Sequence, residues 1–179
     1  MRFPGCAISL ILVLILSAPV SQATAQRLPV CNTREMVRNG NRITIGFQQL
    51  ANTFNRNLAA NRSTFSDLHL SSEGGNKLRV SGNNNGKPVS IVGPLQPAEG
   101  GNVVLRADQI VQNGSPEKGL MGLFGKELSD YFKNTPSVNA HGDNIFIRPD
   151  LLLNLSGQVT GVSLDNSGVT LQFASQPCR

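Results

Sequence analysis

The alternation of apolar and polar residues over positions 64–92 is the feature that most constrains this chain. A period of two is typical of a β-strand with one buried face. The inward-facing residues recur in three pairs, which are Leu68 and Leu70, Leu78 and Val80, and Val89 and Ile91. Turn residues separate the pairs at 73–76 and 83–86, and the second turn ends in Asn-Gly, which tolerates the positive φ angles of a tight hairpin. The segment therefore predicts three strands joined by hairpins.

Further strands and a short helix are predicted after this segment. A fourth strand, longer than average, is expected over 102–112, where Asn113-Gly114 ends it. Strands through Val138 and Ile145 follow, and the terminal residues 159–164 and 169–173 form a hairpin around a turn. Between them, a proline and an aspartate at the start of 149–155 indicate a short helix.

Two amphipathic helices are predicted beside the strands. In the first, which begins near residue 45, Leu50, Phe54 and Leu58 share one face with Phe47 and Ala51. The second spans 115–133, where Ser115 is the expected N-cap and three glycines lower helix stability. Its apolar face is wide and contains Leu120, Met121, Leu123, Phe124, Leu128 and Phe132. This face either packs on the sheet or forms a mobile, lipid-facing lip. Helices beside an antiparallel sheet indicate an α+β fold.

The first 25 residues have the pattern of a secretory signal. Arg2 supplies the positive start, an apolar run covers 7–20, and 23–25 matches the small-x-small cleavage rule. A retained membrane anchor is the alternative. Export to the periplasm or another extracytoplasmic compartment is therefore expected, with a basic arm over 26–44 and one domain over 45–179. Such a compartment permits a disulfide between Cys31 and Cys178, and two free thiols are the alternative.

Positive charge is concentrated in the first third of the chain. Residues 26–62 contain six arginines and one acidic residue, Glu35. This excess favours contact with anionic lipid headgroups at a membrane surface, and a solvated surface is the alternative. The residues expected to make the contact are Arg38, Arg42, Arg56 and Arg62. The scarcity of aromatic residues among the arginines argues against a nucleic-acid partner.

Residue patterns typical of catalysis are missing from the sequence. His69 and His141 lack metal-ligand spacing, and no nucleophile motif is present, so we expect neither enzymatic activity nor a metal or other cofactor. An enzyme of lipid or glycan turnover would instead require Asp143, Asp150 or His141 to cluster in a cleft. An exported domain with surplus apolar helix surface suits a carrier of hydrophobic ligands.

A series of segments resembles the LmeA-like family of bacterial exported phospholipid-binding proteins. The series comprises 65–70, 78–82, 86–93, 104–114, 144–152 and 169–173, in matching order and spacing. The resemblance implies a tubular lipid-binding (TULIP-like) fold, in which a long curved antiparallel sheet is wrapped around one or two amphipathic helices. It also implies phospholipid binding or transfer in the cell envelope without catalysis. The expected groove is lined by the apolar faces of the two helices. The alternative is an envelope structural or protein-interaction module with a fully packed core; no oligomeric state is predicted.

Overall fold

The computed structural model describes residues 36–117, 136–175 and 177. The predicted secretory signal, both cysteines of the predicted disulfide, and residues 118–133 of the predicted second helix lie outside the described residues. The expected start of that helix is wrong, because Ser115–Pro116 forms the short strand β8. β8 pairs with the preceding strand β7 (Gln109–Gln112), so the chain makes a hairpin there.

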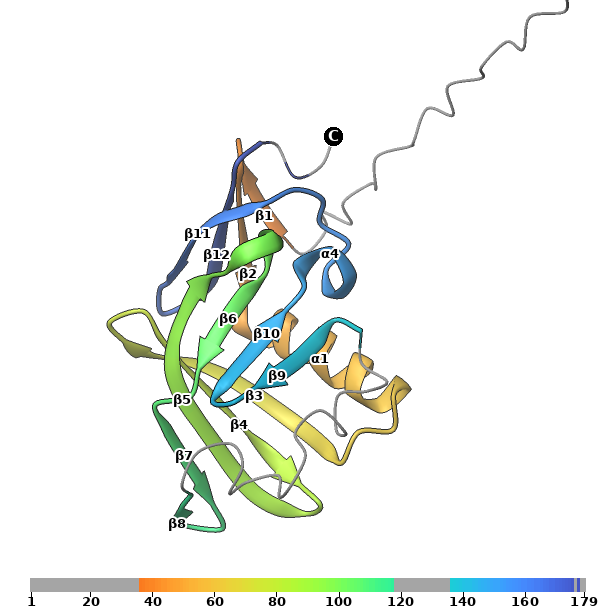
Figure 1. Cartoon of the computed structure of the whole chain (residues 1–179), viewed down its shortest axis with the longest axis vertical. Coiled ribbons are helices and arrows are strands. Elements are labelled where there is room, and N and C mark those ends of the chain that lie inside the picture. The colour runs from red at the N-terminus through yellow and green to blue at the C-terminus, as the bar shows by residue number, and fades with distance from the viewer. Residues whose placement is uncertain (1–35, 118–135, 176, 178–179) are drawn as a thin grey trace, which may run out of the picture.

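The first sheet contains the three strands predicted over 64–92, and they are confirmed as β3, β4 and β5. The strand order is β3-β4-β5-β6-β10-β9, and β7 and β8 extend the sheet from β5. Figure 1 shows β5 as a long curved strand, with β6, β10 and β9 beside one end of it and β7 and β8 beside the other. The strands span β3 Phe65–Gly74, β4 Lys77–Asn84, β5 Lys87–Pro97, β6 Val103–Arg106, β9 Val138–His141 and β10 Asn144–Ile147.

The single strand predicted over 102–112 is wrong, because the chain divides there into β6 and β7. β6 pairs with the last residues of β5, whereas β7 pairs with an earlier part of the same strand. At the break, the Ala107 N–H donates to the Asp143 carbonyl and the Asp108 N–H donates to the Val92 carbonyl. These bonds to β5 and to the β9–β10 turn hold the bend, so it is fixed by tertiary contacts.

The second sheet joins the two ends of the described chain. Its order is β1-β2-β12-β11, with β1 Met36–Asn39, β2 Arg42–Gly46, β11 Val159–Leu164 and β12 Gly168–Phe173. β2 pairs antiparallel with β12, which places Ile43 opposite Leu171 and Ile45 opposite Val169. All four side chains are buried. From Met36 onward, the segment expected as a basic arm is therefore a hairpin that belongs to this sheet.

The first predicted helix is confirmed as α1 (Phe47–Ala60), which packs against β3. Leu50, Ala51 and Leu58 are its buried residues. No side chain caps its first turn, and its three asparagines have low helix propensity, so burial of the apolar face supplies most of its stability. The short helix predicted over 149–155 is α4 (Pro149–Leu152), which is one turn long. Glu99–Gly101 forms a turn of 3₁₀ helix, η2. In the described part of the chain, no helix is long and apolar enough to cross a membrane.

The predicted fold class is wrong. The expected architecture was one long sheet wrapped around one or two amphipathic helices, whereas the described residues form two sheets and one helix longer than a single turn. The difference arises because β2 pairs with β1 and β12, and β12 pairs with β2 and β11. Both edges of each strand are thus occupied, and neither strand can extend the first sheet.

A single apolar cluster connects the two sheets. It contains Leu78 and Leu105 from the first sheet together with Ile45 and Phe173 from the second. Asn76, in the β3–β4 turn, reinforces the junction. Its side-chain amide donates to the carbonyl of Leu95 in β5 (2.7 Å), and its side-chain oxygen accepts from the N–H of Leu164 in β11 (3.0 Å).

Candidate functional site

An apolar cavity of about 80 Å³ lies between α1 and the inner face of the first sheet. We call it the first cavity. Its described lining is entirely apolar, and it comes from α1, β3, β4, β5, β6, β9 and β10. The lining residues are Phe54, Leu58, Phe65, Leu68, Leu70, Leu78, Val80, Ile91, Leu105, Val138, Ile145 and Ile147.

The alternation of side chains along each strand explains why these lining residues meet. Successive residues of a strand point to opposite faces, so Leu78 and Val80 of β4 share the inner face with Ile91 of β5. Leu70 and Val80 are opposite one another in the β3–β4 register, and both are half-buried. The half-buried members of the lining, Phe54, Leu70, Val80, Ile145 and Ile147, form the accessible rim of the first cavity.

Asn55 fastens α1 to the edge strand β3 beside the first cavity. Its side-chain oxygen accepts from the Leu68 N–H at 2.8 Å, and its amide nitrogen donates to the Leu68 carbonyl at 3.1 Å. Leu68 follows Asp67, whose φ of 55° marks an irregularity in the β3–β4 ladder. Asn55 therefore pairs with the N–H and the carbonyl of Leu68, a residue that has no partner in the β3–β4 register.

Replacing Asn55 with alanine is expected to lower the free energy of unfolding by roughly 1 to 3 kcal/mol, because it leaves two backbone groups of a buried residue without these partners. Denaturant unfolding followed by circular dichroism measures the change. Asn52→Ala is the matched control, since the exposed Asn52 side chain on the same helix accepts only one long bond, from Gln48. Equal losses in the two variants would contradict this role of Asn55.

A smaller apolar cavity of about 30 Å³ lies between the two sheets, and we call it the second cavity. Its lining includes Leu95 and Val103 of the first sheet and Ile45, Val169 and Leu171 of the second. Leu50, Pro149, Leu152 and Leu153 complete the part that is not shared with the first cavity. Three side chains line both cavities: Phe54, Leu78 and Ile147.

The predicted groove residues of α1 are divided between these cavities. Leu58 lines the first cavity, Leu50 lines the second, and Phe54 lines both. The other six predicted residues, Leu120, Met121, Leu123, Phe124, Leu128 and Phe132, lie outside the described residues. Sequence reasoning missed the strand residues of the lining, although their alternation had already assigned Leu68, Leu70, Leu78, Val80 and Ile91 to an inward face.

The four predicted headgroup arginines are placed apart from the apolar lining. Arg38 and Arg42 flank the turn between β1 and β2, whereas Arg56 is on the exposed side of α1 and Arg62 follows its last turn. Arg56 lines a shallow polar depression together with Gln48, Gln49, Asn52 and Asn55. The structure thus divides the arginines into a hairpin pair and a helix pair, and their contact with headgroups stays a prediction.

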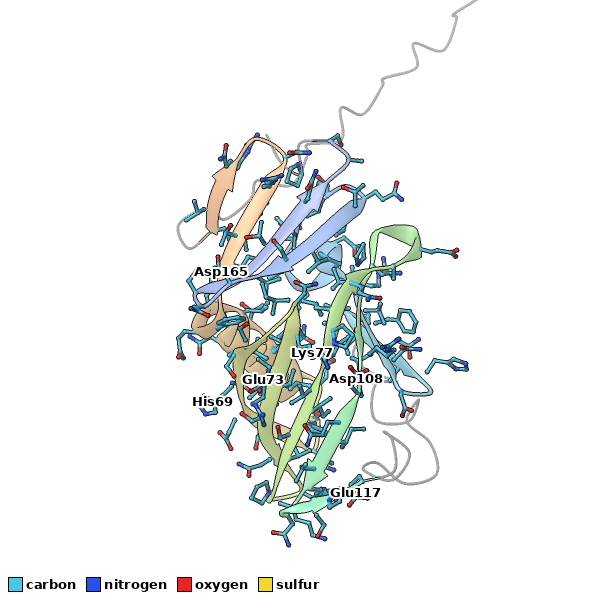
Figure 2. All side chains as sticks on the ribbon, turned by 90° about the vertical axis from the view of Figure 1, so that its left-hand side faces the viewer. His69, Glu73, Lys77, Asp108, Glu117 and Asp165 are labelled. Atoms are coloured by element: carbon cyan, nitrogen blue, oxygen red, sulfur yellow. The ribbon has the colours of Figure 1, made fainter. Side chains whose placement is uncertain are left out.

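Charged residues of the first sheet lie on its outer face, opposite the first cavity. Figure 2 shows His69, Glu73, Lys77 and Asp108 on the side of the molecule that faces the viewer. Lys77 Nζ is 3.3 Å from a carboxylate oxygen of Asp108, and Arg79 forms an ion pair with Glu73. The hydrogen bond from Arg79 lowers the pKa of the Glu73 carboxyl below its usual value. These pairs form a solvated surface and leave the apolar lining uncharged.

The residues proposed for a hydrolytic cleft are not gathered at one place. His141 ends β9 and Asp143 lies in the β9–β10 turn, while Asp150 is in the first turn of α4, after the other end of β10. Asp150 accepts from Arg148 at 2.8 Å, and this bond lowers the pKa of its carboxyl. Within residues 36–117, 136–175 and 177, no group of three His, Cys, Asp or Glu side chains could hold a metal ion.

Comparison with protein-family models, with curated proteins and with solved structures finds no significant match to this chain. The interpretation of the two cavities therefore rests on the residues of this chain alone.

Proposed function

We propose that this chain is an exported lipid-binding protein that holds an acyl chain of a phospholipid in the first cavity. The observation that carries the proposal is the composition of the lining, in which every described residue is apolar. A hydrocarbon chain gains about 0.8 kcal/mol for each methylene group removed from water, and this lining has no polar side chain to desolvate. The signal-like residues 1–25 support export.

The size of the first cavity determines how a chain would enter. A volume of about 80 Å³ is below the roughly 150 Å³ of an engineered cavity that binds benzene, so an acyl chain requires the lining to move apart. The half-buried rim residues of α1, β3, β4 and β10 are the ones able to move, because solvent borders them on one side.

The same small volume favours a second candidate function from a different class. A non-enzymatic structural or protein-interaction module of the cell envelope would have a fully packed core, and a cavity of this size is close to that state. The two candidates differ in one measurable property, which is the uptake of lipid.

Native mass spectrometry of the full chain, purified without detergent and then incubated with phosphatidylglycerol vesicles, tests the proposal. We expect one lipid to remain bound to the protein. Val80→Ser, which puts a hydroxyl group at the rim, should reduce this uptake, whereas Val37→Ser should not, because Val37 is 71% exposed on β1 and lines neither cavity. Absence of bound lipid before and after incubation would overturn the proposal and favour the module.

The arginine pairs make the choice of headgroup testable in the same experiment. Arg56 and Arg62 are closer along the chain to the cavity residues Phe54, Leu58 and Phe65 than Arg38 and Arg42 are. Guanidinium groups favour phosphate and other anionic headgroups. Uptake from phosphatidylglycerol vesicles is therefore expected to exceed uptake from phosphatidylcholine vesicles. Equal uptake would mean that the arginines do not select the headgroup.

A further inference from the structure

Three residues line both apolar cavities, and we call them the partition. Phe54 comes from α1, Leu78 from β4 and Ile147 from β10, and each of them lines both cavities. Beyond the partition, the apolar lining continues between the sheets to Val169 and Leu171 of β12. Apolar lining therefore extends past the first cavity, and the three shared residues mark the boundary between the two cavities.

Phe54 is the member of the partition best able to move. Leu78 is 3% exposed and stands within a strand that is paired on both sides, so neighbouring strands fix its position. Phe54 is half-buried on a helix, and turning its ring changes only side-chain torsions. Ile147 is also half-buried, but its branched side chain is stiff and smaller.

We propose that Phe54 is the specificity-determining residue of the lipid site and that it limits the length of the acyl chain that is bound. This inference rests on the proposed function. With its ring between the cavities, Phe54 limits the ligand to a chain that fills the first cavity; with the ring turned away, the two cavities form one slot. A longer hydrocarbon chain can then pass from the first cavity into the second.

The chain-length dependence of fatty-acid binding tests this role. Caprylate, laurate and palmitate serve as probes, and isothermal titration calorimetry gives their affinities for the full chain and its variants. Each additional buried methylene group strengthens binding about fourfold. We expect Phe54→Ala to raise the palmitate-to-caprylate affinity ratio at least tenfold over the unaltered protein, and Phe54→Trp to lower it.

Phe47→Ala is the matched control, because Phe47 is a half-buried phenylalanine on the same helix that lines neither cavity. It reproduces the loss of a phenyl group from α1 and should leave the affinity ratio unchanged. If all three fatty acids bind the unaltered protein and the ratio is the same in Phe54→Ala and Phe47→Ala, Phe54 has no selective role and the proposed function stands. If no fatty acid binds the unaltered protein or either alanine variant, this inference fails; if phosphatidylglycerol is not taken up either, the proposed function fails as well.

Discussion

Replacing Gly93 with alanine is expected to lower the free energy of unfolding by about 3 kcal/mol. A Cβ atom at this position would lie 1.7 Å from the Arg106 carbonyl oxygen and 2.7 Å from its carbon. Both atoms belong to the backbone of the last residue of β6, and no rotamer change removes the overlap. Gly93 lies where β5 changes partner, after the residues paired with β7 and before those paired with β6. Relief of the overlap must therefore displace one of these strands.

Gly161→Ala separates this overlap from the general effect of adding a methyl group to a strand. Gly161 is on β11, and its nearest neighbour would be the side chain of Gln172 at 3.4 Å, which is an ordinary contact. Its effect should stay within about 0.5 kcal/mol. Denaturant unfolding of both variants measures the difference. A small effect in Gly93→Ala would mean that β6 approaches β5 less closely than the structure indicates.

The displacement caused by Gly93→Ala should also reach the cavities. Ile91 and Leu95 lie on either side of Gly93 along β5, and they line the first and second cavity, respectively. Leu105, one residue before Arg106, lines the first cavity as well. Lipid uptake by Gly93→Ala is therefore expected to fall even under conditions in which the variant remains folded.

The elements that could be predicted from the sequence are those whose pattern is local. β3, β4 and β5 were predicted because apolar residues alternate along each strand and turn residues separate them. α1 was predicted because Leu50, Phe54 and Leu58 repeat at helical spacing. In each case one face meets the core and the other meets solvent, and the residue pattern records that difference.

The elements that could not be predicted depend on partners distant in the sequence. β1 is mostly exposed, and β2 is short, with only Ile43 and Ile45 buried. The partner of β2 is β12, with Thr44 opposite Thr170. No residue pattern within 26–46 indicates that β2 pairs with β12. The break between β6 and β7 has no glycine or proline, because bonds to Val92 and Asp143 hold it.

The candidate site shows the same division. The inward faces of the strands were predictable, but which inward residues face α1 and which face the second sheet depends on how the sheets pack. Phe54 was predicted as one groove residue among several. Its position between two cavities follows only from the arrangement of β4 and β10 around it.

Phe173→Ala is expected to have the second large effect, a loss of about 3 to 5 kcal/mol in the free energy of unfolding. Phe173 is 1% exposed on β12, and its ring fills space beside Gly157, where an added Cβ atom would be 3.6 Å from the ring. Its backbone bonds with Asn41 do not involve the ring, so the alanine variant can keep them. The loss therefore reports the packing of the ring. Phe146→Ala, on β10, is the matched control, since Phe146 is half-buried and lies outside the apolar cluster.

Hydrogen exchange of the Phe173→Ala variant distinguishes whether the two sheets unfold as one unit or separately. Because a single apolar cluster contains residues of both sheets, the Phe173→Ala variant should lose hydrogen-exchange protection at Leu105 in the first sheet as well as at Ile43 in the second. Loss confined to the second sheet would mean that the sheets open separately. The second cavity lies between them, so separate opening would expose its lining to water each time and remove the path beyond Phe54 on which chain selection depends. Equal loss at both amides would mean that the path persists as long as the protein is folded.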